Sequence, residues 1–188
     1  CYVGGCLSLL MRDGSGSLNN AENDAPITVK AKVSGNTYIG GVVGYIDGTT
    51  NKTLTNGKNG NILVELASIA SGKTYAIGGV AGRMVDHCVP MTNYGDVTIK
   101  GKINTNVYAG GLVAYPNNYN RRNMTNDATI TIDAEVTGWC RVGGMCGGGL
   151  YGGIYTNCHS SGLIHFTKNA KIGGAAYIGG LHGEYITT

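Results

Sequence analysis

Acidic side chains are the first place to look for chemistry, because enzymes that cut polysaccharides work with paired carboxylates. The chain has 11 Asp and Glu residues among 188, dispersed along the sequence. Asp47 and Asp86 stand at matching places in two successive repeats, with Arg83 and His87 close to Asp86. These residues form the best candidate polar cluster, yet a solvated loop explains them better than a catalytic pair. The sequence therefore predicts a protein that is not an enzyme and has no catalytic residue.

The histidines show no spacing typical of a metal site. His87, His159, His165 and His182 are scattered, without an H-x-H or H-E-x-x-H pattern. His182 stands where other repeats have mostly apolar residues, so we expect it on the surface of the last repeat. No metal and no cofactor is predicted.

The six cysteines are an even number, which favours disulfides in a secreted chain. Cys140 and Cys146 flank a glycine pair in the segment C-R-V-G-G-M-C. A bridge between them requires the chain to fold back at the glycines, because a straight strand would hold the sulfur atoms far apart. A Cys140–Cys146 disulfide is therefore one hypothesis. The other is that these cysteines are ordinary members of the repeat, since Cys1 stands at the same place as Cys140.

A glycine pair in an apolar frame recurs six times and is the main signal of architecture. The intervals between the first glycines are 36, 38, 32, 33 and 36 residues. Self-similarity with a period of this size is typical of solenoids and arrays. The repeats begin near Tyr2, Tyr38, Tyr75, Tyr108, Arg141 and Tyr177. The repeat glycines are Gly4, Gly5, Gly40, Gly41, Gly78, Gly79, Gly110, Gly111, Gly143, Gly144, Gly179 and Gly180.

Each glycine pair is followed by an apolar residue, usually a small polar one, and then Asn. We expect these asparagines to stack as a hydrogen-bonded ladder, formed by Asn20, Asn56, Asn93, Asn126 and Asn157. An alternating strand comes next, as in Ile130, Ile132, Ala134 and Val136. Such alternation is typical of a strand with one face in the core and one in solvent.

Three strands per repeat are most simply buried by winding them into one coil and stacking the coils. The sequence thus predicts an all-β parallel β-helix, or β-solenoid, of about five to six coils with 32–38 residues each, in a single domain over 1–188. A β-propeller would need four antiparallel strands in each repeat. The apolar residues on either side of the glycine pair would both point inward if the glycines bend the chain. Tyr2, Tyr38, Tyr108 and Tyr177 would form a partial outward stack.

Composition excludes other classes of function. The chain has 33 Gly, 13% charged residues and a net charge of +3. Its basic residues are scattered, so there is no electrostatic footprint for nucleic acid. No apolar run approaches the roughly 18–20 residues of a membrane-spanning helix, and we expect no membrane span.

The frame of the repeat resembles the GLUG motif. The fullest matches are GGVVGY at 40–45 and GGLVAY at 110–115, and TNCHSSGLI at 156–164 matches the second half. GLUG repeats occur in bacterial surface and secreted proteins, as β-solenoid stalks beside adhesive or protease modules. The resemblance extends over almost the whole chain and implies an extracellular or cell-surface protein. It implies no catalytic residue, because the motif has none.

The leading interpretation is a non-enzymatic structural or adhesive repeat domain. With a glycine-pair strand at each end, we expect stacking end to end into filaments, or further repeats of the same chain. The alternative is a glycan-binding module that uses Tyr38, Tyr45, Tyr108, Tyr115 and Tyr177 for stacking. A polysaccharide-degrading β-helix enzyme is the third class. Two sequons, at Asn51 and Asn123, are candidate glycosylation sites in the variable loops.

Overall fold

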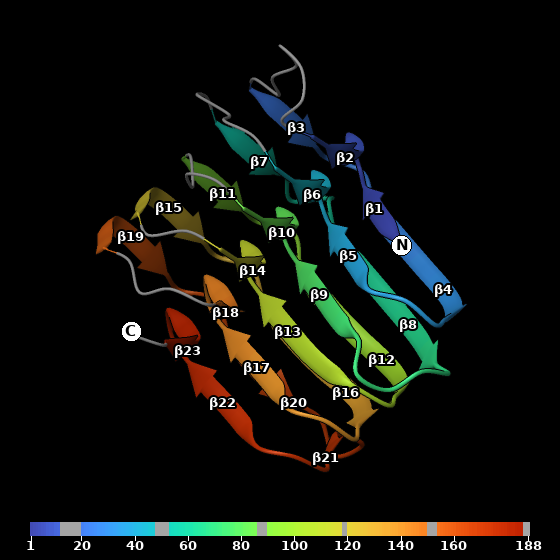
Figure 1. The fold of residues 1–188 in the computed structure, drawn as a ribbon. Coiled ribbons are helices and arrows are strands. Elements are labelled where there is room, and N and C mark those ends of the chain that lie inside the picture. Colours follow the sequence, from blue (N-terminus) through green and yellow to red (C-terminus); the bar gives the residue numbers. More distant parts are fainter. Residues whose placement is uncertain (12–19, 48–52, 86–89, 118–119, 150–153, 186–188) are drawn as a thin grey trace.

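The computed structural model describes residues 1–11, 20–47, 53–85, 90–117, 120–149 and 154–185. Within these ranges every regular element is a β-strand, and all strand pairs are parallel. The strands wind into coils that stack along one axis, from β1–β4 at one end to β22 and β23 at the other (Figure 1). The predicted β-solenoid is confirmed.

Four sheets run along the axis, and every complete coil gives one strand to each sheet. Sheet A contains β1 (Tyr2–Gly4), β5 (Thr37–Gly40), β9 (Thr74–Gly78), β13 (Asn106–Gly110), β17 (Cys140–Gly143) and β22 (Ala176–Gly179). Sheet B contains β2 (Leu7–Leu10), β6 (Val43–Ile46), β10 (Ala81–Met84), β14 (Val113–Pro116), β18 (Cys146–Gly149) and β23 (His182–Tyr185).

The second half of each coil supplies the other two sheets. Sheet C contains β3 (Ala21–Asn23), β7 (Leu54–Asn56), β11 (Met91–Asn93), β15 (Asn120–Asn126) and β19 (Ile154–Ser160). Sheet D contains β4 (Ile27–Val33), β8 (Ile62–Ser68), β12 (Val97–Ile103), β16 (Ile130–Val136) and β20 (Ile164–Phe166). The short β21 (Lys171–Ile172) also pairs with β16.

The interior consists of two apolar columns rather than one. Ile39 and Ile77 of sheet A pack against the alternating residues of sheet D, such as Ile99. Val42 and Met91 belong to the second column, which lies between sheets B and C. The strict register between coils places equivalent residues side by side, for example Ile99 beside Ile132. Burial alternates along β16 as the sequence predicts.

The glycine pair marks the point where the chain turns from one column to the other. In the second coil, sheet A ends at Gly40 and sheet B begins at Val43. Ile39 before the pair enters the first column and Val42 after it enters the second. The expected bend, with both apolar neighbours directed inward, is confirmed. Gly41 has no room for a side chain, because a Cβ there would overlap the amide of Asn56.

An asparagine ladder lies between the two columns, directly against the bend. The Nδ2 group of Asn23 donates to Oδ1 of Asn56 at 2.9 Å, Asn56 donates to Asn93 at 2.8 Å, and Asn93 donates to Asn126 at 3.1 Å. All four side chains are buried. The Nδ2 groups of Asn23, Asn56 and Asn126 also donate to backbone carbonyls, as in the 2.8 Å bond from Asn56 to Gly60. The ladder therefore meets the hydrogen-bonding needs of a buried polar group.

The predicted ladder was right in its three central members and wrong at both ends. Asn23 replaces Asn20, and Ser160 replaces Asn157, with Asn126 Nδ2 at 3.5 Å from Ser160 Oγ. Asn20 and Asn157 instead occupy an exposed corner, where their backbones are left-handed with φ of 49° and 52°. Asn is among the few non-glycine residues that tolerate this conformation.

Candidate functional site

The tyrosines of the repeat gather on the outer side of the glycine bend, in the angle between sheets A and B. Close backbone packing makes this angle tight. A Cβ on Gly82 of sheet B would overlap the backbone of Ile39 in sheet A, and Gly147 lies in the same way against Ala109. Small residues at the bottom of the angle therefore allow larger side chains to meet above them.

Two neighbouring columns of residues fill this angle. The sheet A column reads Tyr2, Tyr38, Ala76, Tyr108, Arg141 and Tyr177. The sheet B column reads Leu9, Tyr45, Arg83, Tyr115, Gly148 and Glu184. We refer to these side chains, together with Trp139, as the tyrosine–arginine layer. Its smallest member is complementary to one of the arginines, because Arg141 lies against Gly148.

Arg83 joins the second and fourth coils. Its guanidinium carbon lies 5.5, 5.4 and 5.3 Å from the ring centroids of Tyr38, Tyr45 and Tyr115. The Nη1 group donates a 3.1 Å hydrogen bond to the hydroxyl of Tyr38. Each cation–π contact of this kind is worth about 0.5–2 kcal/mol, depending on desolvation. Arg83 thus continues the ring stack past Ala76, which has no ring to offer.

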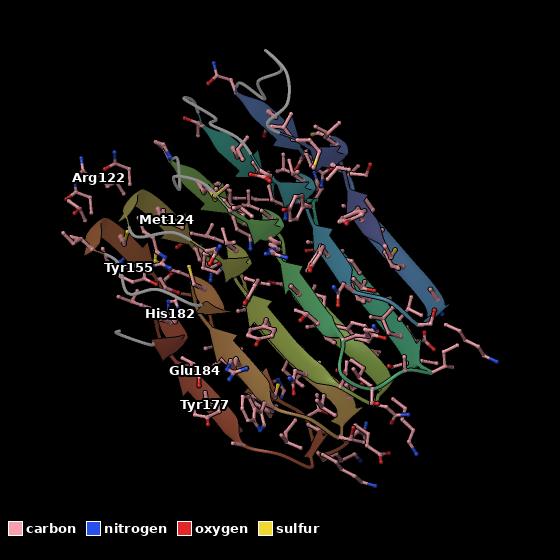
Figure 2. All side chains as sticks on the ribbon, viewed as in Figure 1. Arg122, Met124, Tyr155, Tyr177, His182 and Glu184 are labelled. Atoms are coloured by element: carbon pink, nitrogen blue, oxygen red, sulfur yellow. The ribbon has the colours of Figure 1, made fainter. Side chains whose placement is uncertain are left out.

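Arg141 makes the corresponding link nearer the C-terminal end of the rod. Its guanidinium carbon lies 5.0 Å from the ring centroid of Tyr108, 4.4 Å from that of Trp139 and 5.3 Å from that of Tyr177. Nη1 donates to the hydroxyl of Tyr108 at 2.7 Å, and Nε forms an ion pair with Oε2 of Glu184. Figure 2 shows Tyr177 and Glu184 on the last strands of sheets A and B. A side chain at Gly148 would overlap Arg141.

The five tyrosines proposed for glycan stacking are therefore brought together on one face. The rings of Tyr38 and Tyr45 are 5.7 Å apart, and those of Tyr108 and Tyr115 are 4.8 Å apart. Tyr177 follows through Arg141. The layer is more enclosed than an outward stack would be, since Tyr38 is only 4% exposed. Burial raises the pKa of Tyr45 and of Tyr108, which keeps both hydroxyls protonated.

Sequence reasoning assigned Arg83 to a polar cluster with Asp47 and Asp86 and did not place either arginine in this layer, although a signal was present. Arg141 stands at the tyrosine position before a glycine pair, and Arg83 stands at the tyrosine position that Tyr45 and Tyr115 occupy after one. A planar guanidinium can replace an aromatic ring in a stack. Reading each arginine as a substitute tyrosine would have placed both in the layer.

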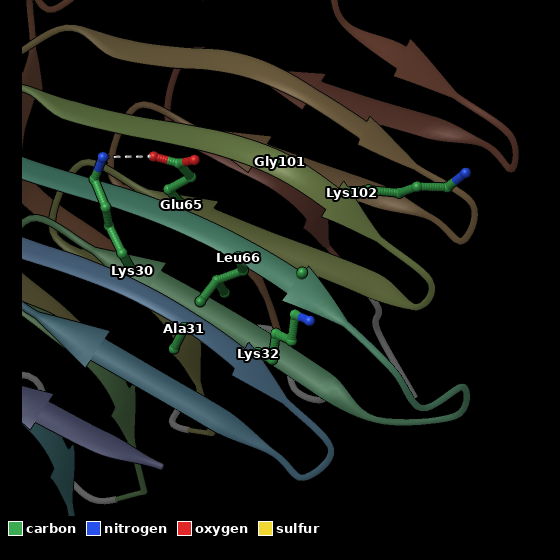
Figure 3. Close-up of a pocket in the computed structure, with 8 residues that line it drawn as sticks. Lys30, Ala31, Lys32, Glu65, Leu66, Gly101 and Lys102 are labelled. Carbon is green, nitrogen blue, oxygen red and sulfur yellow. Dashed lines mark ion pairs between the residues drawn. The ribbon is translucent and has the colours of Figure 1, made fainter.

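A second surface feature is a hollow of about 350 Å³ on the outer face of sheet D (Figure 3). Its floor contains Ala67 and Gly101, and Lys32 and Lys102 stand on its rim. Gly101 has a φ of +107°, a conformation open to glycine but rarely to other residues. The nearby Lys30–Glu65 ion pair spans 3.0 Å between exposed side chains, so it adds little stability.

A third group is internal and lies between sheets B and C near the last coil. Arg121 is fully buried, with its guanidinium carbon 5.0 Å from the ring centroid of Tyr155. The hydroxyl of Tyr155 is 2.5 Å from Nδ1 of His182, and Figure 2 shows these two side chains near one another. Burial and then the charge of Arg121 lower the pKa of His182 to about 4. The expected surface position of His182 is therefore wrong.

The remaining candidate residues do not converge. Asp86, His87 and Asn51 lie outside the described residues, and Arg83 belongs to the tyrosine–arginine layer. Asn123 is exposed with a φ of 53°, and its Oδ1 accepts a 3.2 Å bond from Asn157. Within the described ranges no cluster of three His, Cys, Asp or Glu residues has metal-site geometry.

The disulfide hypothesis for Cys140 and Cys146 fails because the bend separates them. Cys140 is in the apolar column between sheets A and D, and Cys146 is in the column between sheets B and C. Both are free and buried thiols. Burial raises the pKa of Cys140 to about 12 and also raises that of Cys146.

The fold and the tyrosine–arginine layer define the class of the protein as a parallel β-solenoid with aromatic side chains packed in the angle between sheets A and B. Comparisons with protein-family models, with curated proteins and with solved structures found no match. None of the described segments forms a helix that is long and apolar enough to cross a membrane.

Proposed function

We propose that the chain is a structural and adhesive segment of an extracellular or cell-surface rod and has no catalytic activity. The observation that carries this proposal is that the repeated residues serve coil-to-coil contact. The glycine pair and the buried asparagines each bond or pack with the equivalent residue one coil away, and Tyr2 packs on Tyr38 in the same way. The resemblance to GLUG repeats supports the extracellular location.

The outer coils support a further part of the proposal, which is growth by stacking. Ile178 and Leu181 of the last coil are 55% and 40% exposed, whereas the equivalent Ile77 and Leu112 of inner coils are fully buried. One more coil of the same kind would cover them, either from a longer chain or from a second copy. A head-to-tail contact that does not close produces a filament.

Sedimentation velocity over a range of concentrations tests this stacking. We expect species larger than a monomer to grow with concentration and to be suppressed by Ile178→Glu. The matched control is Ile69→Glu, because Ile69 is 69% exposed but follows β8 in the middle of the rod. A strictly monomeric protein, or equal effects of the two variants, would contradict end-to-end assembly.

A second candidate function is glycan binding on the tyrosine–arginine layer. It is favoured by the convergence of five predicted tyrosines on one face, with Tyr45, Tyr115 and Tyr177 only partly buried. Aromatic rings of this kind offer flat apolar platforms with polar hydroxyls at their rims. An array of neutral and acidic saccharides tests the proposal, and we expect binding that Tyr115→Ala weakens. No binding to any saccharide would leave only the structural role.

A further inference from the structure

The two arginines of the tyrosine–arginine layer lie in similar surroundings but differ in one respect. Each guanidinium contacts three aromatic rings, at 5.3–5.5 Å for Arg83 and at 4.4–5.3 Å for Arg141. Each also donates from Nη1 to one tyrosine hydroxyl. The difference is the anion. Arg141 holds the carboxylate of Glu184, and Arg83 has no carboxylate within ion-pair distance among the described residues.

Arg141 shows which ligand such surroundings accept. The Glu184 carboxylate comes from the next coil and meets the guanidinium at Nε. Its side chain is 18% exposed and that of Arg141 is 5% exposed, so this is a largely desolvated pair. Charge-assisted bonds between guanidinium and carboxylate are among the strongest in proteins. The rings orient the guanidinium, and the Glu184 carboxylate supplies the opposite charge.

At Arg83 this carboxylate is missing among the described residues. The Nε atoms of Arg83 and Arg141 are both buried without a regular hydrogen bond, but only that of Arg141 has a described carboxylate within ion-pair distance. Asp47 is near enough to affect the pKa of Tyr45, but it forms no ion pair with Arg83. Arg83, Tyr45 and Tyr115 are all partly exposed. A buried charged donor left unpaired is costly. A carboxylate bound at Arg83 would therefore supply the ion pair that Glu184 supplies to Arg141.

We infer that Arg83, with Tyr45 and Tyr115 on either side of it along sheet B, binds the carboxylate of an acidic saccharide. This inference deepens the glycan-binding proposal and rests on it. A uronic acid presents a carboxylate directly on a pyranose ring. The guanidinium would bind the carboxylate while the ring packs against a neighbouring tyrosine. A peptide carboxylate brings no such ring. The tyrosine–arginine layer also presents side chains, not a free strand edge to which a peptide backbone could bond.

The test compares two probes that differ only at the carboxyl group, which is ionised in one and methyl-esterified in the other. The probes are an oligomer of galacturonic acid and the same oligomer as its methyl ester, titrated calorimetrically into the intact chain. We expect the acid to bind at least about tenfold more tightly than the ester, and Arg83→Gln to remove that preference. Arg122→Gln is the matched control, because Arg122 is exposed on β15 in sheet C and should leave the preference unchanged.

The outcomes separate this inference from the broader proposal. If acid and ester bind equally and Arg83→Gln changes neither, the carboxylate site is wrong although glycan binding stands. If neither oligomer binds and a hexaglutamate peptide does, the saccharide assignment is overturned. If no saccharide binds at all, both proposals fail. Arg83→Lys provides a second variant should Arg83→Gln unfold the rod: it keeps the charge but loses the planar fork, so the acid preference should fall without vanishing.

Discussion

Replacing Asn93 with alanine should test how strongly the ladder holds the coils together. The Asn93 side chain is fully buried and takes part in three hydrogen bonds. It accepts from Asn56 Nδ2 at 2.8 Å and from the Gly95 backbone at 3.2 Å, and it donates to Asn126 Oδ1 at 3.1 Å. Alanine would remove all three and leave two buried donors and one buried acceptor without a partner.

The magnitude follows from those three groups. A buried polar group that loses its partner costs about 1–3 kcal/mol, so Asn93→Ala, which leaves three such groups, should lower the free energy of unfolding by at least about 3 kcal/mol. Because each coil is stabilised chiefly by its neighbours, the loss would weaken the contacts on both sides of the third coil. Urea unfolding followed by circular dichroism and by the fluorescence of Trp139 measures the change.

Asn157 provides the matched control, because sequence reasoning placed it in the same ladder. It lies at an exposed corner with a φ of 52°, and its side chain makes a single exposed bond to Asn123. Glycine suits that backbone, so Asn157→Gly should change the free energy of unfolding by less than about 0.5 kcal/mol. A loss below about 1 kcal/mol for Asn93→Ala, or equal losses for the two variants, would refute the ladder's role.

Two further predictions concern titration and reactivity. His182 has a pKa of about 4 in the fold and about 6.5 when unfolded, so the unfolded chain binds more protons between these values. Stability should therefore fall by about 3 kcal/mol as the pH drops through that window, and His182→Gln should flatten the dependence measured by urea unfolding; an unchanged slope would contradict the burial of the imidazole. Cys1 and Cys6 are exposed free thiols whereas Cys140 and Cys146 are buried. Iodoacetamide should label the first pair in the native state and the second only in denaturant, as peptide mass mapping would show; a Cys140–Cys146 bridged peptide would contradict this.

Sequence reasoning reached the fold because the repeat fixes both the period and the inner face. The alternating segment Ile130, Ile132, Ala134 and Val136 became β16, and the glycine pair became the bend. The ladder register at the outer coils could not be read the same way. Near Asn20 and Asn157 an apolar–polar–polar triplet occurs twice, three residues apart, and only one copy is the ladder.

A better rule counts backward from the alternating strand. Asn23, Asn93, Asn126 and Ser160 each stand four residues before the strand's first inward residue, as Asn93 does before Val97. Asn56 stands six residues before Ile62 because that coil has a longer turn. The second triplet near Asn157 carries Ser160, whose hydroxyl can also accept from the ladder. A pattern defined by asparagine alone therefore selects the corner residue instead.

The tyrosine–arginine layer could not be derived from one repeat, because its complementarity exists only between coils and between two sheets. Arg83 packs on tyrosines of the second and fourth coils, and Arg141 fits because Gly148 has no side chain. Ring stacking alone would be satisfied by tyrosine at every position, as the repeat frame suggests. Two cations in the stack add charge, and only one of them is neutralised within the described chain, by Glu184. Arg83 already packs on three rings and bonds to the hydroxyl of Tyr38, but its charge has no ion-paired carboxylate among the described residues, and that imbalance is the reason to look for an anionic ligand at Arg83.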